Sequence, residues 1–113
     1  MSDPIVLPHH KLHTFQLAKE LLLAVQAAAI RDSHLRDQAL RAAKSVCLNC
    51  AEGAGRVTHA DKARAFTIAR GELIEAAAAV EIAALVGDAS KESFERVAFI
   101  ADRLVGMPTK LIR

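Results

Sequence analysis

The longest helix-favouring stretch of the chain lies between residues 58 and 87, and it constrains the fold more than any other feature. It contains no proline, and Thr58 and Asp61 are candidate N-caps, because their side-chain oxygens can accept from free N–H groups of the first turn. At about 1.5 Å per residue, such a helix is roughly 40 Å long. Gly53 and Gly55 are expected to end the preceding helix, since glycine adopts the left-handed conformation without steric cost. In so short a chain, the long helix must be the element against which the others pack.

The composition favours helices over strands. Of the 113 residues, 52% are hydrophobic and only 4% are aromatic, and alanine, which supplies much of the apolar count, has the highest helix propensity. Five glycines and three prolines are too few for a turn-rich β protein. The length predicts one domain. We expect a flexible N-terminal segment at residues 1–11, which contains Pro4 and Pro8, followed by a single four-helix-bundle domain at residues 12–113.

Capping residues and apolar periodicity divide this domain into helices. Gly106 and Pro108 are expected to kink or break the last one near residues 104–107, because proline removes a hydrogen bond and clashes with the preceding turn. Gly71 lies inside the third helix, where it costs about 1 kcal/mol relative to alanine, so we expect a close backbone approach or a bend there. The expected helices run from residues 12–14 to residue 30, from residue 32 or 33 to residue 51 or 52, from residue 60 to residue 86, and from residue 90, where Ser90 caps the fourth, towards the C-terminus.

The long helix carries a seam of alternating large and small apolar residues. Phe66, Leu73 and Val80 recur every seven residues, with Ala69 and Ala76 between them, a spacing suited to close antiparallel packing. The first helix is apolar almost all round, and so is buried on more than one side. These patterns predict an all-α fold, an antiparallel up-down four-helix bundle. Because the apolar surface exceeds the needs of one bundle, we also expect self-association into a homo-oligomer through the first and third helices.

A set of spaced residues suggests a family. The pattern resembles that of four-helix-bundle proteins first noted as open reading frames in 23S ribosomal-RNA intervening sequences, to which the accessory protein of diversity-generating retroelements is similar. The resemblance implies a cyclic homopentamer without catalytic activity. Because the retroelement relatives bind nucleic acid and a reverse transcriptase through basic surface, it also implies RNA, DNA or a reverse transcriptase as partners, besides further copies of the chain. The residues that carry the resemblance are Ser45, Asn49, Ala51, Glu52, Gly53, Gly55, Arg56, Ala69, Gly71, Leu73, Glu75 and Gly87.

Asn49, Glu52 and Arg56 surround the expected end of the second helix. The structural interpretation is that their side chains satisfy backbone groups left free at a helix end, with Glu52 paired to Arg56. The functional interpretation is a ligand or partner site at that loop. Glu75 and Glu81 lie among apolar neighbours on the long helix, and a buried carboxylate would need a partner such as Arg70.

The sequence gives no pattern for a metal, a cofactor or catalysis. A di-iron bundle needs Glu-x-x-His pairs, and none occurs. Cys47 and Cys50 form a C-x-x-C without further zinc ligands, and two small buried residues is the favoured interpretation. His9, His10 and His13 are read as a solvated cluster. Without a nucleophile–base pair or a phosphate loop, an enzyme is the weakest class.

Basic residues form two strips, which are the candidate nucleic-acid-binding residues. A net charge of +2 is mild for a nucleic-acid binder, but copies around a ring would multiply the local field. One hypothesis is therefore a non-enzymatic oligomer that binds nucleic acid or a nucleic-acid enzyme. The alternative is a structural scaffold for protein–protein interaction without nucleic acid. The strips comprise Arg31, Arg36, Arg41 and Lys44 in the second helix region, and Arg56, Lys62, Arg64 and Arg70 early in the third.

The expected location is the cytoplasm. The first residues lack a basic n-region of a signal peptide, and two cysteines in such a chain indicate reduced thiols. The most apolar run, from Leu21 to Ile30, is too short to span a bilayer. We therefore expect no membrane partner.

Overall fold

A computed structural model describes residues 3–112, and the side chains of residues 3–106. Within that range the chain is all-α: it contains four α-helices and one short 3-10 helix, and no strand. The all-α prediction and the number of long helices are thus confirmed. The elements are η1 (Pro8–Lys11), α1 (His13–Ala27), α2 (Ser33–Gly55), α3 (His59–Leu85) and α4 (Lys91–Ile112).

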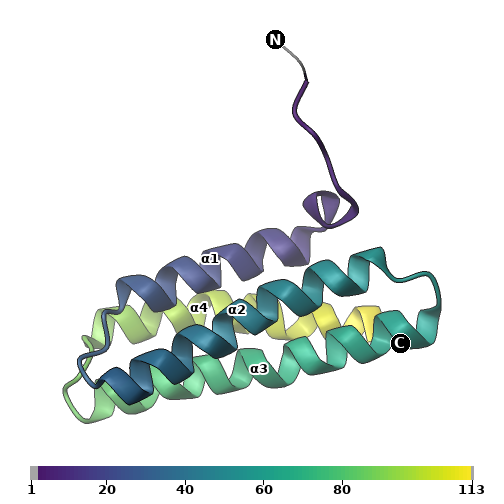
Figure 1. Cartoon of the computed structure of the whole chain (residues 1–113). Helices are drawn as coiled ribbons and strands as arrows, with labels where there is room; N and C mark the ends of the chain where they lie inside the picture. Colours follow the sequence, from purple (N-terminus) through teal and green to yellow (C-terminus); the bar gives the residue numbers. More distant parts are fainter. Residues whose placement is uncertain (1–2, 113) are drawn as a thin grey trace.

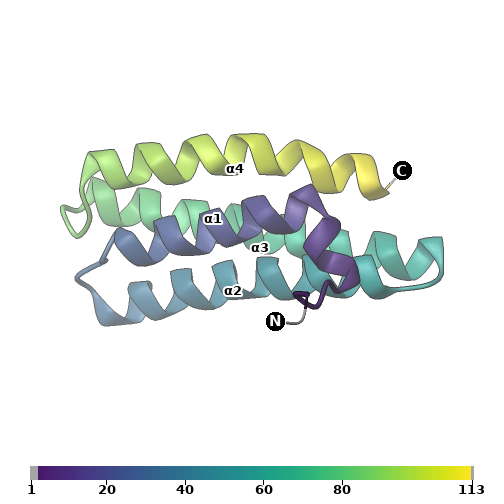
Figure 2. The same ribbon diagram turned by 90° about the horizontal axis from the view of Figure 1, so that it is seen from above.

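The four long helices lie side by side around one apolar core (Figures 1 and 2). Helix α1 packs on α2 and α4, and α3 packs on α2 and α4. The α1–α2 and α3–α4 connections lie at one end of the bundle, and the α2–α3 connection lies at the other (Figure 1). At the first of these ends the N–H of Arg31 donates to the carbonyl of Asp88 at 3.0 Å, so the two connections are bonded to each other. The largest fully buried side chains are those of Leu17, Leu21, Ile30, Val46, Cys50, Leu73, Val80, Val97 and Leu104.

Side-chain caps fix the starts of three helices. An Asp32 Oδ accepts from the Leu35 N–H at 2.8 Å. The Thr58 hydroxyl accepts from the Asp61 N–H at 3.1 Å, so Thr58 is the cap and Asp61 lies in the first turn. The Ser90 hydroxyl accepts from the Ser93 N–H at 3.0 Å. These bonds satisfy N–H groups that have no partner within their own helix. The predicted cap Ser90 is confirmed, and the structure selects Asp32 and Thr58 where the sequence left Asp32 or Ser33 and Thr58 or Asp61 open.

Helix α1 ends three residues earlier than expected. It stops at Ala27, because Ala29 takes a left-handed conformation with φ of 46° and turns the chain towards α2. This is uncommon for a residue with a Cβ atom, and neither a glycine nor a proline marks the site. Ile30 lies beyond the helix but is buried in the core. Tertiary packing of Ile30 therefore accompanies a helix end that local sequence does not signal.

Gly53 does not end α2, so the sequence-based expectation was wrong at this position. Helix α2 continues to Gly55, and its C-cap, Arg56, is extended rather than left-handed. Gly53 is buried, and a Cβ atom on it would lie 2.8 Å from the Phe66 ring of α3. Its function is to let α3 approach closely. The glycine that does adopt the left-handed conformation is Gly87, with φ of 82°, directly after α3.

Two of the alternatives expected in helix interiors are excluded, namely a close backbone approach at Gly71 and a break of the last helix at Pro108. At Gly71 a Cβ atom would have no neighbour within 4 Å, so no other part of the described chain approaches it closely. Helix α4 continues to Ile112, so Pro108 does not break it. The N-terminal lead-in also contains one turn of 3-10 helix, η1, which contacts α1 and α2.

Helix α3 is apolar on two opposite sides. The predicted inner seam is buried, as Phe66, Leu73 and Val80 all lie in the core. Further large apolar side chains of α3 and its C-cap point away from this seam and are exposed; we call this set the outer face of α3. No helix in residues 3–112 is long and apolar enough to cross a membrane. The outer face consists of Ile68, Ile74, Ile82, Leu85 and Val86.

Candidate functional site

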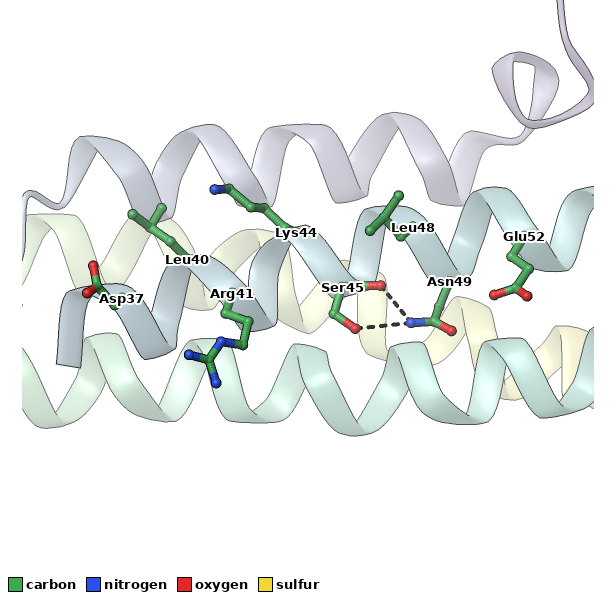
Figure 3. A pocket seen from close by; sticks show the side chains of 8 residues that line it. All are labelled: Asp37, Leu40, Arg41, Lys44, Ser45, Leu48, Asn49 and Glu52. Carbon is green, nitrogen blue, oxygen red and sulfur yellow. Dashed lines mark hydrogen bonds between the residues drawn. The ribbon is translucent and has the colours of Figure 1, made fainter. Parts of the chain in front are cut away.

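The exposed side of α2 carries a shallow groove of about 710 Å³. Arg41 and Lys44 line it and are both exposed. Figure 3 shows Lys44 directed towards α1 and Arg41 towards α3. No ion-pair partner is found for either among the described side chains. The other lining residues are Asp37, Leu40, Ser45, Leu48, Asn49 and Glu52.

The charge of this α2 groove is balanced. Two carboxylates, those of Asp37 and Glu52, line it together with the two basic side chains. Both carboxylates can be read from the sequence, but the predicted basic strip counted only the cations. Because opposite charges within a Debye length largely cancel each other's field, the groove does not form a positively charged patch.

The family-motif residues of α2 bond to each other at the α2–α3 end. The Asn49 side-chain amide donates to the Ser45 carbonyl at 2.9 Å and to its hydroxyl at 3.0 Å, as Figure 3 shows. Arg56 forms an ion pair with Glu52 one turn earlier, as the sequence predicted. The Glu52–Arg56 pair fits the structural interpretation, whereas Asn49 bonds to Ser45 inside α2 rather than to a backbone group left free at the helix end. The ion pair also leaves Arg56 less available to an anionic partner.

A second hollow, of about 350 Å³, lies between the end of α2 and the start of α3. It brings Arg56 and Arg64 together with Glu52 and Asp61, so its charge is balanced as well. Asp61 occupies the first turn of α3, where a carboxylate is favoured by the helix dipole. The cations of this hollow therefore have carboxylates beside them, as in the α2 groove.

Glu75 is not buried, contrary to the sequence-based expectation, and neither is Glu81. An Oε of Glu75 accepts from the Gln38 amide at 3.4 Å, rather than pairing with Arg70. Partial burial raises the pKa of Glu72, and Glu75 raises it further by charge repulsion and by a hydrogen bond to the protonated form. The hollow that holds these carboxylates, between α2 and α3, has an acidic surplus; it is lined by His34, Asp37, Gln38, Arg41, Ala42, Glu72 and Glu75.

The remaining basic residues do not join a common surface. Arg36 donates to the Ile30 carbonyl at 3.1 Å, which ties it to the α1–α2 connection. Arg31 lines a hollow with Asp88 at the same end of the bundle, far from the α2–α3 connection (Figure 1). Lys62 is half-buried and Arg70 is exposed on α3. The eight candidate cations are thus spread along the bundle rather than gathered.

Cys50 is buried, as its structural interpretation expects, whereas Cys47 is only half-buried and the half-buried His9 packs against Phe15 rather than lying fully in solvent. Burial raises the pKa of the Cys50 thiol to about 12, and the half-buried Cys47 thiol donates to the Ala18 carbonyl at 3.3 Å. His10 accepts from the Leu7 N–H at 3.0 Å through Nδ1, and His9 stacks edge-on against Phe15. In the described part of the chain, no three histidine, cysteine or acidic side chains converge as a metal site would require.

Sequence reasoning missed an apolar groove of about 340 Å³ between α3 and α4. The hollow exists because alanines on both helices fill little space, and larger apolar side chains flank it. The signal was available as Ala77 and Ala78 on α3 and Ala98 and Ala101 on α4, but only the pairing of the two helices makes them face each other. We call it the α3–α4 groove; its lining comprises Leu73, Ile74, Ala77, Ala78, Glu81, Phe94, Ala98, Ala101, Asp102 and Val105.

Comparison with known families gives one match. Residues 10–110 match the family described as 23S rRNA-intervening sequence protein. The match spans all four long helices from α1 to most of α4. A search of curated proteins found no match.

Proposed function

The chain belongs to the 23S rRNA-intervening sequence protein family, and from that premise we propose that it is a non-enzymatic homo-oligomeric scaffold. Each copy is an antiparallel up-down four-helix bundle, and copies assemble through α3 into a ring. The resemblance in the sequence favours a cyclic pentamer. We place the protein in the cytoplasm, where its two free thiols remain reduced.

The observation that carries this proposal is the outer face of α3. Five large apolar side chains are exposed on α3 and at its C-cap, Val86, and Leu85, the most exposed, retains 80% of its surface. Scattered single apolar residues are normal on a protein surface, but several large ones along one helix indicate an interaction site. Gly71 lies on the same helix with open space above it, so the backbone of another copy can approach there.

Sedimentation of the purified chain tests the assembly. We expect an oligomer at micromolar concentration, and we expect the double variant Ile82→Glu with Leu85→Glu to sediment as a monomer with unchanged helix content. Val57→Glu is the matched control, because Val57 is 93% exposed in the α2–α3 connection and lies off α3. A wild-type chain that remains monomeric at these concentrations would contradict the proposal.

Nucleic-acid binding is the second candidate function. Arg41 and Lys44 favour it, since both are exposed and neither has an ion-pair partner among the described side chains. Arg64 and Arg70 are exposed on α3, and a ring would repeat all four cations. The carboxylates in the same hollows weaken the attraction, which is why the scaffold comes first.

Titration with labelled RNA and DNA at two salt concentrations separates the candidates. If nucleic acid is a ligand, affinity falls with salt, and Arg41→Ala with Lys44→Ala reduces the salt slope by about 1 for each lost phosphate contact. Glu52→Gln leaves the slope unchanged or steeper. Absence of binding at low salt removes this candidate and leaves the scaffold.

A further inference from the structure

The chain before η1 exposes consecutive large apolar side chains. Ile5, Val6 and Leu7 are 83%, 57% and 48% exposed, between Pro4 and Pro8. Figure 1 shows this segment projecting away from the four helices. Proline fixes φ at Pro4 and Pro8 and restricts Leu7, so part of the conformational entropy of the segment is already lost before it binds. We call residues 3–7 the N-terminal arm.

The α3–α4 groove has the shape and chemistry to receive such a segment. Its alanines leave space between Ile74 and Phe94, which are large enough to form walls. Its charged lining residues are both acidic, Glu81 and Asp102. An apolar channel bordered by carboxylates fits an extended apolar segment that is followed by a cation, Lys11.

We propose that the N-terminal arm of one copy docks in the α3–α4 groove of a second copy. The arm supplies three apolar side chains to the groove, and the exposed Lys11, four residues after the arm, lies near the acidic border. This inference rests on the proposed self-association and names the contact that links neighbouring copies. Ile74 belongs both to the outer face of α3 and to the groove, so a copy packed on α3 borders the groove.

The arm cannot reach the groove of its own bundle. It starts from η1, which contacts α1 and α2, whereas the groove lies on the opposite side, between α3 and α4 (Figures 1 and 2). Its few residues extend at most about 17 Å at roughly 3.5 Å each. The path around a bundle two helices thick, each about 10 Å across, is longer than that. A second copy is therefore the occupant.

Cross-linking between differently tagged copies tests the arm. A tagged Val6→Cys chain is mixed with an untagged Ala98→Cys chain, allowed to exchange subunits and mildly oxidised. We expect a disulfide between tagged and untagged chains, located by mass spectrometry, because docking brings the two Cα atoms within the 4.4–6.8 Å that a disulfide spans. Ala78→Cys offers a second groove position. Lys44→Cys on α2 is the matched control and should not cross-link.

A second measurement does not depend on disulfide geometry. Changing Ile5, Val6 and Leu7 together to Ser should raise the concentration for half-assembly at least tenfold without altering helix content, since these side chains are exposed in the single copy. If the chain still assembles, but neither groove cysteine cross-links and the serine variant assembles with unchanged affinity, the arm contact is wrong. Self-association would then still hold. A wild-type chain that sediments as a monomer overturns both.

Discussion

The inner seam and the outer face of α3 have similar composition but different environments. On the inside, Phe66, Leu73 and Val80 alternate with alanines and are buried by the other helices. On the outside, Ile74 and Leu85 are equally apolar but exposed. Apolar periodicity therefore identifies surfaces that need a partner, but it does not say whether that partner lies within the chain. The following predictions test how far the two sides differ, in order of decreasing effect.

The largest difference is expected from truncating neighbouring residues on the two sides. Leu73→Ala removes a side chain that is 1% exposed and should lower the free energy of unfolding by about 2–5 kcal/mol, through lost burial and a cavity. Ile74→Ala, at 50% exposure, should cost about 1 kcal/mol or less. Denaturant unfolding at a concentration where both variants share one assembly state measures the pair. Equal losses would mean that another copy buries the outer face as fully as the core.

Two glycines should respond to alanine in opposite directions. Gly53→Ala places a methyl group 2.8 Å from the buried ring of Phe66 and should cost about 1–3 kcal/mol. In the unassociated chain, Gly71→Ala meets no atom within 4 Å and should stabilise α3 by about 0.5–1 kcal/mol.

Thermal unfolding of both glycine variants provides the measurement. The double variant Gly53→Ala with Phe66→Leu is the control and should recover part of the loss, since a smaller side chain relieves the contact. Destabilisation of the unassociated chain by Gly71→Ala would contradict the open environment at that position. Weaker assembly of a Gly71→Ala chain with normal stability would place a second copy against it.

The smallest effect concerns Glu72, at the edge between the two sides. Its pKa is raised in the folded chain, so ionisation of Glu72 opposes folding above that pKa, and the penalty is absent below the ordinary glutamate value. Glu72→Gln should therefore raise the midpoint of thermal unfolding slightly at pH 7, with the gain fading as pH falls towards 4. Glu81→Gln is the matched control on the same helix, and the same pH-dependent gain in both variants would argue against a specific effect of Glu75.

Local chemistry made the helix starts predictable, whereas tertiary contacts determined what was missed. Asp32, Thr58 and Ser90 act within one turn of their own helix, so sequence located these helix starts to within a few residues, although it left Asp32 or Ser33 and Thr58 or Asp61 open as the cap. The left-handed Ala29 and the buried Gly53 depend on packing between helices, which no local pattern encodes.

The charge balance of the candidate site could have been predicted from the sequence. Asp37 and Asp61 precede Arg41 and Arg64 by four and three residues, so each pair lies on one face of its own helix, and the same pairs share hollows in the folded chain. The α3–α4 groove, in contrast, exists only once two helices are paired. Sequence could therefore identify the charges and the small residues, but not the groove that the small residues form.

The hydrogen bond between the Arg31 N–H and the Asp88 carbonyl should determine which end of the bundle opens first. Because both atoms belong to the main chain, replacing the side chains at these positions does not remove the bond. The α1–α2 and α3–α4 helix pairs therefore remain linked at that end when these residues are substituted. Fraying should begin at the opposite end, where the chain passes from α2 to α3. Backbone amides beside the α2–α3 connection should exchange with deuterium faster than those beside the α1–α2 and α3–α4 connections. The helices would then separate from that end first.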